Sequence, residues 1–289
     1  MFQSRLTQTA AAVQAHVDVA LAPLGQTDVV QAMRYAMQGG KRLRAFLVME
    51  SAELFDIPAA QAIWPASAIE AVHAYSLIHD DLPCMDDDDL RRGQPTVHVK
   101  WDDATAVLAG DALQTIGFEW CLNPETSPIV DVRATLALRL AQAAGAGGMV
   151  LGQALDISAE TAQTPFTLYK ITELQYGNTG ALISWSATAG AVLAQQDTAA
   201  LAHYARAIGL AFQIADDILD IEGDAEKAGK RLQKDEAAGK ATFVSLLGLD
   251  QAKQRARDLV NDACDAVSIY GAKAITLQET AAFIIARDN

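Results

Sequence analysis

The stretch ASAIEAVHAYSLIHDDLPCMDDDD, residues 66–89, joins an apolar helical pattern to a dense group of aspartates. Apolar residues recur at helical spacing from Ala66 to Asp80, which predicts a helix that ends among carboxylates. Pro83 cannot continue this helix, so the following loop must fold back if Asp86 is to approach Asp80. A helix C-terminus already carries about half a negative charge, so acid placed there calls for a cation.

A second acidic group, Asp216-Asp217-Ile218-Leu219-Asp220, ends another apolar helical pattern. Asp216 and Asp220 share one helix face, whereas Asp217 is turned about 100° away. Carboxylate oxygens suit hard cations, and Mg²⁺ completes its coordination with water and phosphate oxygens. Two such groups predict a phosphate-bearing ligand held through metal. For a single acidic run, a solvated turn is the more common interpretation.

Composition predicts one large α-helical domain. The chain has 289 residues, of which 51% are hydrophobic, and no linker rich in proline, glycine or serine divides it, so we expect one domain over 1–289. Helical periodicity runs almost from end to end and predicts an all-α fold. The expected helices span residues 4–22, 28–38, 44–54, 66–80, 103–122, 128–144, 167–195, 198–221, 242–247, 250–269 and 275–287.

Charge and cysteine content exclude several classes of protein. The formal net charge of −14 argues against a nucleic-acid or anionic-membrane surface. The three cysteines lie far apart, so neither a disulfide framework nor a zinc site is expected. Residues 1–24 lack the apolar run of a signal peptide, and the stretch Gly180 to Ala194 is too short to span a bilayer. We therefore expect a cytoplasmic protein without membrane insertion.

Basic residues gather at three places, which favours phosphate recognition over scattered surface charge. Lys41, Arg42 and Arg44 follow a double glycine, and Arg91 and Arg92 follow the first acidic group. The third set lies after the second acidic group and consists of Lys227, Lys230, Arg231, Lys234 and Lys240. Arginine forks and lysine charges bind phosphates, although any one set taken alone fits a solvated surface with ion pairs.

Several separated segments together resemble one family. The matching segments are GGKRLR at 39–44, the stretch 73–93, LAGDAL at 108–113, GQALD at 152–156, TGALI at 179–183, the stretch 212–220, and the pairs 229–230 and 239–240. They resemble the trans-polyprenyl diphosphate synthases and, within them, the bacterial farnesyl diphosphate synthases. This resemblance implies an all-α, single-domain isoprenoid synthase fold with a helical bundle around a central apolar cavity. It also implies a homodimer that condenses an allylic diphosphate with isopentenyl diphosphate.

The resemblance further implies roles for individual residues. Asp80 and Asp86 would hold two Mg²⁺ and Asp216 a third, with Asp81, Asp217 and Asp220 as ligands or outer partners. The isopentenyl diphosphate site would consist of Gly40, Lys41, Arg44, His73 and Arg92. The allylic diphosphate would meet Arg91, Gln213, Lys230 and Lys240, and Thr179 and Gln213 would stabilise the carbocation. Tyr75 and Ser76, just before the first acidic group, would limit the product to the C15 farnesyl chain.

One departure from the family pattern concerns substrate binding. Asn178 stands before Thr179 where the family has lysine, so a charge for the allylic diphosphate is missing. Three other functions stay open at this point: a geranyl or geranylgeranyl diphosphate synthase, a weakly active subunit of a heteromeric prenyltransferase, and a terpene cyclase. His73 taken alone could also be an ordinary packed histidine. Both acidic groups and Lys41, Arg44 and Arg92 argue against a cyclase, which needs one diphosphate only.

Overall fold

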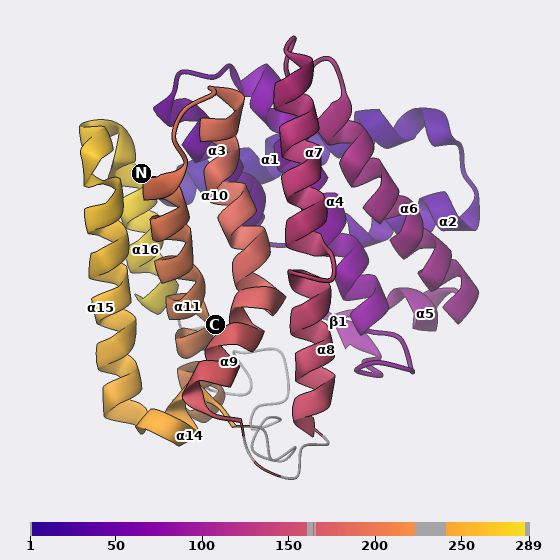
Figure 1. Ribbon diagram of the computed structural model, residues 1–289. Helices are drawn as coiled ribbons and strands as arrows, with labels where there is room; N and C mark the ends of the chain where they lie inside the picture. Colours follow the sequence, from indigo (N-terminus) through magenta and orange to yellow (C-terminus); the bar gives the residue numbers. More distant parts are fainter. Residues whose placement is uncertain (1, 161–163, 165, 223–240, 287–289) are drawn as a thin grey trace. The chain divides into compact units, whose positions relative to one another are not determined.

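The computed structural model describes residues 2–160, 164, 166–222 and 241–286. Contacts between Cα atoms divide the chain into two compact units. The first unit consists of Met1–Leu138 and Ala189–Gln196, and the second consists of Arg139–Thr188 and Asp197–Asn289. Figure 1 shows the helices of both units.

The first unit is helical apart from a short hairpin. Its elements are α1 (Phe2–Leu21), η1 (Ala22–Leu24), α2 (Asp28–Ala36), α3 (Leu43–Leu54), α4 (Ala59–Asp80), β1 (Leu90–Arg91), β2 (Gln94–Pro95), α5 (Val97–Lys100), α6 (Asp103–Leu122), and the beginning of α7 (Val130–Ala144). Strands β1 and β2 are antiparallel, with Leu90 opposite Pro95. The hairpin and α5 were not expected, because two to four residues are too few to show a period.

Helix α4 is the centre of this unit and packs against α3 and α6, as Figure 1 shows for α4 and α6. The two helices approach closely where α6 carries glycine: a Cβ on Gly117 would lie 2.7 Å from Val72 Cγ2. A Cβ on Gly110 would lie 2.1 Å from His79 Nε2. A larger residue at either position would displace the His79 or Val72 side chain or widen the spacing between α4 and α6.

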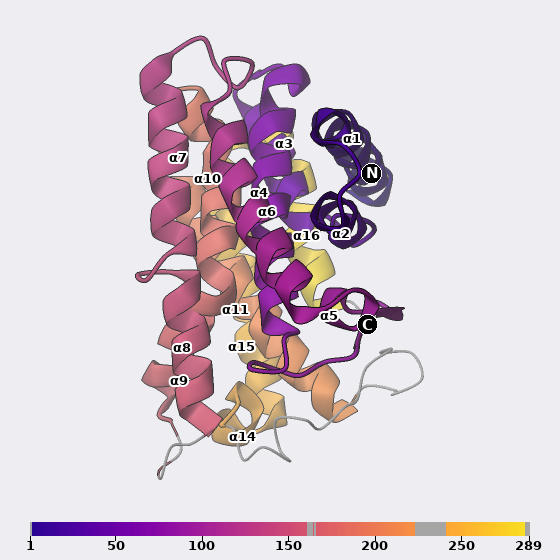
Figure 2. The same cartoon turned by 90° about the vertical axis from the view of Figure 1, so that its right-hand side faces the viewer.

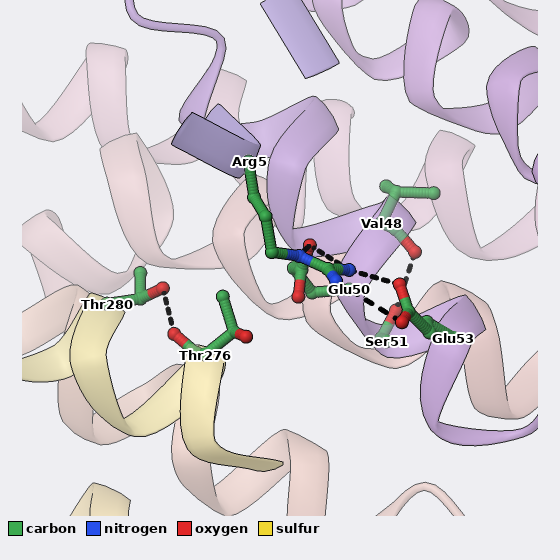
Figure 3. A network of polar contacts seen from close by, with 7 residues as sticks. All are labelled: Arg5, Val48, Glu50, Ser51, Glu53, Thr276 and Thr280. Atoms are coloured by element: carbon green, nitrogen blue, oxygen red, sulfur yellow. Dashed lines mark hydrogen bonds and ion pairs between the residues drawn. The ribbon is translucent and has the colours of Figure 1, made fainter. Parts of the chain in front are cut away.

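The N-terminal helices pack together and are fastened by an ion-pair network. Figure 2 shows α1 beside α2, and α1 also packs on α3. Arg5 of α1 donates from Nε to Glu50 Oε1 at 2.8 Å and from Nη1 to Glu53 Oε1 at 3.3 Å. Figure 3 shows Arg5 reaching both carboxylates, with Ser51 donating to the carbonyl of Val48 at 3.0 Å. The α16 hydroxyls drawn there, Thr280 and Thr276, belong to the second unit.

The second unit consists of the end of α7, α8 (Met149–Glu160), α9 (Leu168–Gln175), the π-helical turn η2 (Tyr176–Gly180), most of α10 (Ala181–Leu193), α11 (Ala199–Glu222), α14 (Phe243–Leu247), α15 (Leu249–Val267), η3 (Ser268–Ala274) and α16 (Ile275–Ala286). Helix α11 packs against α15 and α16, and the three run side by side in Figure 1. The Tyr204 hydroxyl of α11 donates to the carbonyl of Leu277 at 2.7 Å, which ties α11 to α16.

The all-α prediction is confirmed, with three local corrections. Helix α4 begins at Ala59 rather than Ala66, because Pro65 is accepted inside the helix. Helix α8 was missed, because glycines at 145, 147, 148 and 152 weakened the helical pattern. The helix expected over 167–195 contains a π turn at Tyr176–Gly180, where one extra residue widens the helix. The prediction of a single domain over 1–289 stays a prediction.

Candidate active site

The first acidic group lies where α4 ends, and its loop folds back as the sequence predicts. Asp80 is the last residue of α4, and the N–H of Asp86 donates to the carbonyl of Asp80 at 2.8 Å. The N–H of Asp87 donates to the carbonyl of Leu82 at 3.2 Å, and Asp87 has φ +51°. These backbone bonds hold the backbone of Asp86 against that of Asp80, the pair assigned to metal.

Asp81 has a different environment, because it pairs with Arg91 of β1. Arg91 Nε donates to Asp81 Oδ1 at 2.8 Å and to Oδ2 at 2.9 Å, and Nη2 donates to Oδ1 at 2.6 Å. Burial raises the pKa of Asp81, and the bonds to Arg91 oppose that rise. Burial also disfavours the Arg91 cation, but the bonds and charge of Asp81 outweigh it and the Arg91 pKa is raised. Asp81 therefore orients Arg91, one of the predicted diphosphate ligands.

Two loops with left-handed backbone bring Gly40 and Arg92 together. Gly39 and Gly40 have φ +69° and +81°, and Arg92 and Gly93 have φ +53° and +73°. Arg92 Nη1 donates to the carbonyl of Gln38 at 3.1 Å. A Cβ on Gly40 would lie 2.8 Å from Arg92 Cζ, so this approach needs glycine at position 40. The predicted grouping of Gly40 with Arg92 is thus present in the structure.

Arg44 and His73 share this cationic region. Burial lowers the pKa of Arg44, the charge of Glu70 raises it, and the charge of Arg92 lowers it further. The buried Nε of Arg44 has no hydrogen-bond partner within the described part of the chain. Burial and then the charge of Arg44 and Arg92 hold the pKa of His73 well below its usual value. A neutral His73 and an unsatisfied arginine nitrogen beside further cations form an environment that favours an anion.

A cavity of about 140 Å³ opens beside this region, lined among others by Tyr35, Leu77, Asp81, Arg91 and Arg92. Lys100 Nζ lies 3.7 Å from the centroid of the Tyr35 ring, and the Tyr35 hydroxyl donates to the carbonyl of Pro95 at 2.7 Å. These contacts hold the hairpin that carries both arginines. Lys41, which was assigned to the same diphosphate, is exposed at the start of this region.

The two residues assigned to chain length are buried in α4. The ring of Tyr75 meets that of His79 edge-on, with centroids 5.8 Å apart. Burial raises the pKa of Tyr75, and the Gln114 side chain of α6 lowers it. Ser76 Oγ donates to the carbonyl of His73 at 2.9 Å. Tyr75 therefore has polar neighbours on both α4 and α6, within the first unit.

In the second unit, Thr179 and Gln213 meet as a pair. Gln213 Nε2 of α11 donates to Thr179 Oγ1 at 2.8 Å. Thr179 and Asn178 both lie in the π turn, and the backbone of this turn touches α8: a Cβ on Gly152 would lie 2.1 Å from Asn178 N. The glycine of the GQALD segment thus allows α8 to approach the turn that carries both residues.

The second acidic group lies in the last turns of α11, and its aspartates face different ways. Asp217 is 7% exposed and accepts the N–H of Phe243, at the start of α14, at 2.7 Å. Asp216 and Asp220 are half-buried. This matches the predicted rotation of Asp217 away from its neighbours. Lys227, Lys230, Arg231, Lys234 and Lys240 lie outside the described residues.

The carboxylates of the two acidic groups are ligands that suit Mg²⁺. Across 2–160, 164, 166–222 and 241–286, no three side chains of His, Cys, Asp or Glu converge as a metal site. Mg²⁺ commonly takes only one or two carboxylates and obtains its other ligands from water and substrate phosphates. Asp80 at the end of α4 with Asp86 in the loop that follows, and Asp216 and Asp220 near the end of α11, supply such carboxylates.

Two parts of this site were not predicted from the sequence. Glu70 is buried among the arginines, and a lone carboxylate within the apolar run of α4 was an available signal. The pairing of Asp81 with Arg91 could not be predicted, because two residues ten positions apart across a loop need not lie close together. A cavity of about 510 Å³ in the second unit, between α9, α11 and α15, includes Gly180 but none of the predicted site residues.

A profile of the polyprenyl synthetase family matches residues 26–271. The chain belongs to this family. This polyprenyl synthetase is 44% identical over 280 residues to a farnesyl diphosphate synthase of Escherichia coli, covering 94% of this chain and 93% of that protein. It is 38% identical over 267 residues to a geranylgeranyl diphosphate synthase of Cyanophora paradoxa, covering 91% and 89%.

Solved structures agree with the fold. A crystal structure of an FPP/GFPP synthase from Zymomonas mobilis matches this polyprenyl synthetase with a TM-score of 0.89 at 44% identity, covering 98% of each chain. The chain therefore has the isoprenoid synthase fold and is a trans-prenyltransferase. Its family condenses isopentenyl diphosphate with allylic diphosphates and generally depends on Mg²⁺.

Proposed function

We propose that this prenyltransferase makes (2E,6E)-farnesyl diphosphate from dimethylallyl or geranyl diphosphate and isopentenyl diphosphate. The observation that carries the proposal is the cationic region of the first unit, where the buried Nε of Arg44 has no hydrogen-bond partner among the described residues and the charges of Arg44 and Arg92 help to lower the pKa of His73. This cationic region and the first acidic group belong to the same unit. The region could bind the diphosphate of isopentenyl diphosphate, while metal ions on the aspartates would bind the allylic diphosphate. A terpene cyclase has no need for this region.

The proposed chemistry starts with loss of diphosphate from the allylic substrate. Arg91, oriented by Asp81, would bind the departing diphosphate, and its charge would stabilise the growing negative charge. Asp80 and Asp86 would hold two Mg²⁺ and Asp216 a third, and such ions supply Lewis-acid stabilisation to a leaving diphosphate. The Thr179–Gln213 pair would direct its dipoles at the allylic carbocation. The double bond of isopentenyl diphosphate then attacks, and a proton leaves the new chain, with diphosphate as its acceptor.

Product length is proposed to be set by Tyr75. It lies five residues before Asp80, which is about 7.5 Å along the helix axis, and its buried ring would act as a floor for a C15 chain. Ser76 would border the same space. Farnesyl diphosphate synthases at 44% identity support a C15 product, and geranylgeranyl diphosphate is the second candidate because of the relative at 38%.

Product analysis tests both statements. Purified protein should convert dimethylallyl and isopentenyl diphosphates into a C15 product with Mg²⁺, and chelation with EDTA should abolish turnover. Tyr75→Ala should shift the product to C20 or longer, because the floor is removed. A wild-type C20 product would favour the geranylgeranyl alternative, and an unchanged C15 product from Tyr75→Ala would reject Tyr75 as the floor.

We further propose that the protein is a cytoplasmic homodimer. Helix α6 exposes Val107, Leu108 and Leu122, a surface that a second copy would cover. By length and composition, the longer apolar stretch Val130–Ala159 could cross a membrane, although it is interrupted between α7 and α8 at Gly145–Gly148. In a homodimer, packing of helices from two copies would cover the exposed apolar residues of this stretch without a membrane. Both statements extend the relationship to bacterial enzymes of the family.

A further inference from the structure

Glu70 is a buried carboxylate in the middle of the cationic region, and it fastens α4 to the start of α3. It is 3% exposed. Its Oε2 accepts Arg42 Nη1 at 3.2 Å, and its Oε1 accepts the backbone N–H of Ala45 at 3.0 Å. Ala45 lies in the first turn of α3, whose N–H groups have no partner within the helix. Glu70 thus replaces the missing cap of α3, since Arg42 at the N-cap makes no side-chain cap bond.

The contacts of Arg42 engage both terminal nitrogens of its guanidinium with protein groups. Nη2 donates to Gln14 Oε1 at 3.2 Å and to the carbonyl of Met37. Arg42 also has φ +54°, an uncommon conformation for a residue with a side chain. The buried Glu70–Arg42 pair therefore supports the strained turn between Gly39-Gly40 and α3, and it leaves Arg42 unavailable for a ligand.

Arg44 differs from Arg42 because one of its buried N–H groups is not hydrogen-bonded within the part of the chain that the structure describes. It follows Arg42 by two residues, in the first turn of α3, and its buried Nε has no partner among the described residues. Glu70 acts on Arg44 through charge: it raises the pKa of Arg44 and that of Arg92, whereas burial lowers both. One carboxylate thus offsets part of the repulsion among three guanidinium groups, and a net positive charge remains for a ligand.

We propose that Glu70 is the positioning residue of the isopentenyl diphosphate site. By holding Arg42 and capping α3, it presents Arg44 beside His73 and Arg92 before the substrate arrives. This inference rests on the proposed function, which assigns these three residues to isopentenyl diphosphate. It assigns no contact between Glu70 and the substrate, because the carboxylate is buried and would repel a diphosphate.

Glu70→Gln tests the role of the charge. The amide keeps the size of the side chain and can still accept the Ala45 N–H, but it no longer offsets the arginines. Binding of isopentenyl diphosphate must then order Arg44 and Arg92, so its KM should rise on the order of tenfold. The KM for the allylic diphosphate should stay within about twofold, since that substrate meets other residues.

Glu50→Gln is the matched control. Glu50 is also a buried glutamate of the first unit, 6% exposed and paired with Arg5 at 2.8 Å, and it lies outside the cationic region (Figure 3). Glu50→Gln should lower the melting temperature and leave both KM values unchanged. If Glu70→Gln behaves in the same way, Glu70 is merely structural and the inference is wrong.

Further outcomes separate this inference from the proposed function. A wild-type protein that forms no prenyl product overturns the proposed function itself. An active wild type with an unchanged KM for isopentenyl diphosphate in Glu70→Gln overturns the inference alone. If Glu70→Gln does not fold, Glu70→Asp keeps the charge but shortens the reach to Ala45. It should raise that KM selectively by a few fold, and equal changes in both KM values would contradict positioning.

Discussion

In each acidic group, the second aspartate of the Asp-Asp pair is engaged by the protein itself. Asp81 is 3% exposed and binds Arg91, and Asp217 is 7% exposed and caps α14 through the N–H of Phe243. Asp80 and Asp216, the first members, are more exposed. Adjacent helix residues face about 100° apart, so the two carboxylates of each pair lie in different surroundings.

This division of roles predicts different consequences of substitution. Asp80→Ala and Asp216→Ala should each lower kcat by orders of magnitude, because they remove charge stabilisation at the leaving group. Asp217→Ala should instead lower the free energy of unfolding by about 1 to 3 kcal/mol, because the Phe243 N–H loses its acceptor. Steady-state kinetics and urea denaturation separate the two effects. Near-normal turnover of Asp80→Ala would reject its assignment.

Asn178 offers a gain-of-function test. Its side chain is half-buried in the π turn next to Thr179, where the family pattern has lysine. One missing charge-assisted contact costs roughly 1.5 to 3 kcal/mol, about 10- to 100-fold in rate. Asn178→Lys should therefore be faster and have a lower KM for the allylic diphosphate. A variant no better than the parent would mean that another cation has taken over this role.

At the scale of elements, α4 organises the first unit. It carries Glu70, His73, Tyr75 and Asp80 along three turns, so a single helix links the proposed isopentenyl diphosphate site, the proposed floor and the proposed metal-binding end. Its packing on α6 depends on Gly110 and Gly117, which leave room for His79 and Val72. A shift of α4 by even 1 Å would displace all of these groups together.

The docking of α1 on α4 should depend on pH. His16 of α1 shares a hydrogen bond between Nδ1 and Ser67 Oγ at 2.9 Å, and its buried Nε2 has no partner among the described residues. Its ring lies edge-on to Trp64, with centroids 4.5 Å apart. Burial lowers the pKa of His16, so below about pH 6.5 the unfolded chain binds a proton that the folded chain resists.

Stability should accordingly be fully present above about pH 6.5 and fall as the pH drops toward the lowered folded-state pKa of His16. His16→Gln should remove part of this pH dependence. At neutral pH, it should change the free energy of unfolding only through the lost packing of the imidazole ring. Urea denaturation between pH 5 and 8, followed by tryptophan fluorescence, measures both. An identical pH dependence in wild type and His16→Gln would show that His16 does not titrate on unfolding.

At the scale of the whole molecule, association is the open prediction. Leu108 on α6 is 53% exposed, next to Val107. If this face binds a second copy, sedimentation of the wild type should give twice the chain mass of 30.7 kDa, and Leu108→Arg should give monomers. Ile269→Arg is the control, because Ile269 is 73% exposed in the second unit and belongs to no proposed interface. A monomeric wild type would contradict the homodimer.

Part of this molecule could be predicted from local pattern alone. The helices of α1, α3, α6, α11 and α16 follow from apolar spacing, and their ends lie within a few residues of the expected ones. The return of Asp86 to Asp80 followed from Pro83 and was confirmed. The rotation of Asp217 away from Asp216 followed from the helix period. Each of these features depends on interactions between residues that are close in the chain, so the spacing of residue types is enough to predict it.

The amino-acid sequence by itself thus determined the all-α class, the two acidic helix ends and the residue types that suit a metal-bound diphosphate. Only the tertiary structure decided that Asp81 holds Arg91, that Glu70 lies among three arginines, and that Gly152 admits the π turn. These contacts join segments from ten to 28 residues apart across loops and helix pairs. Their geometry depends on how helices pack, and no spacing within one helix or loop contains that information.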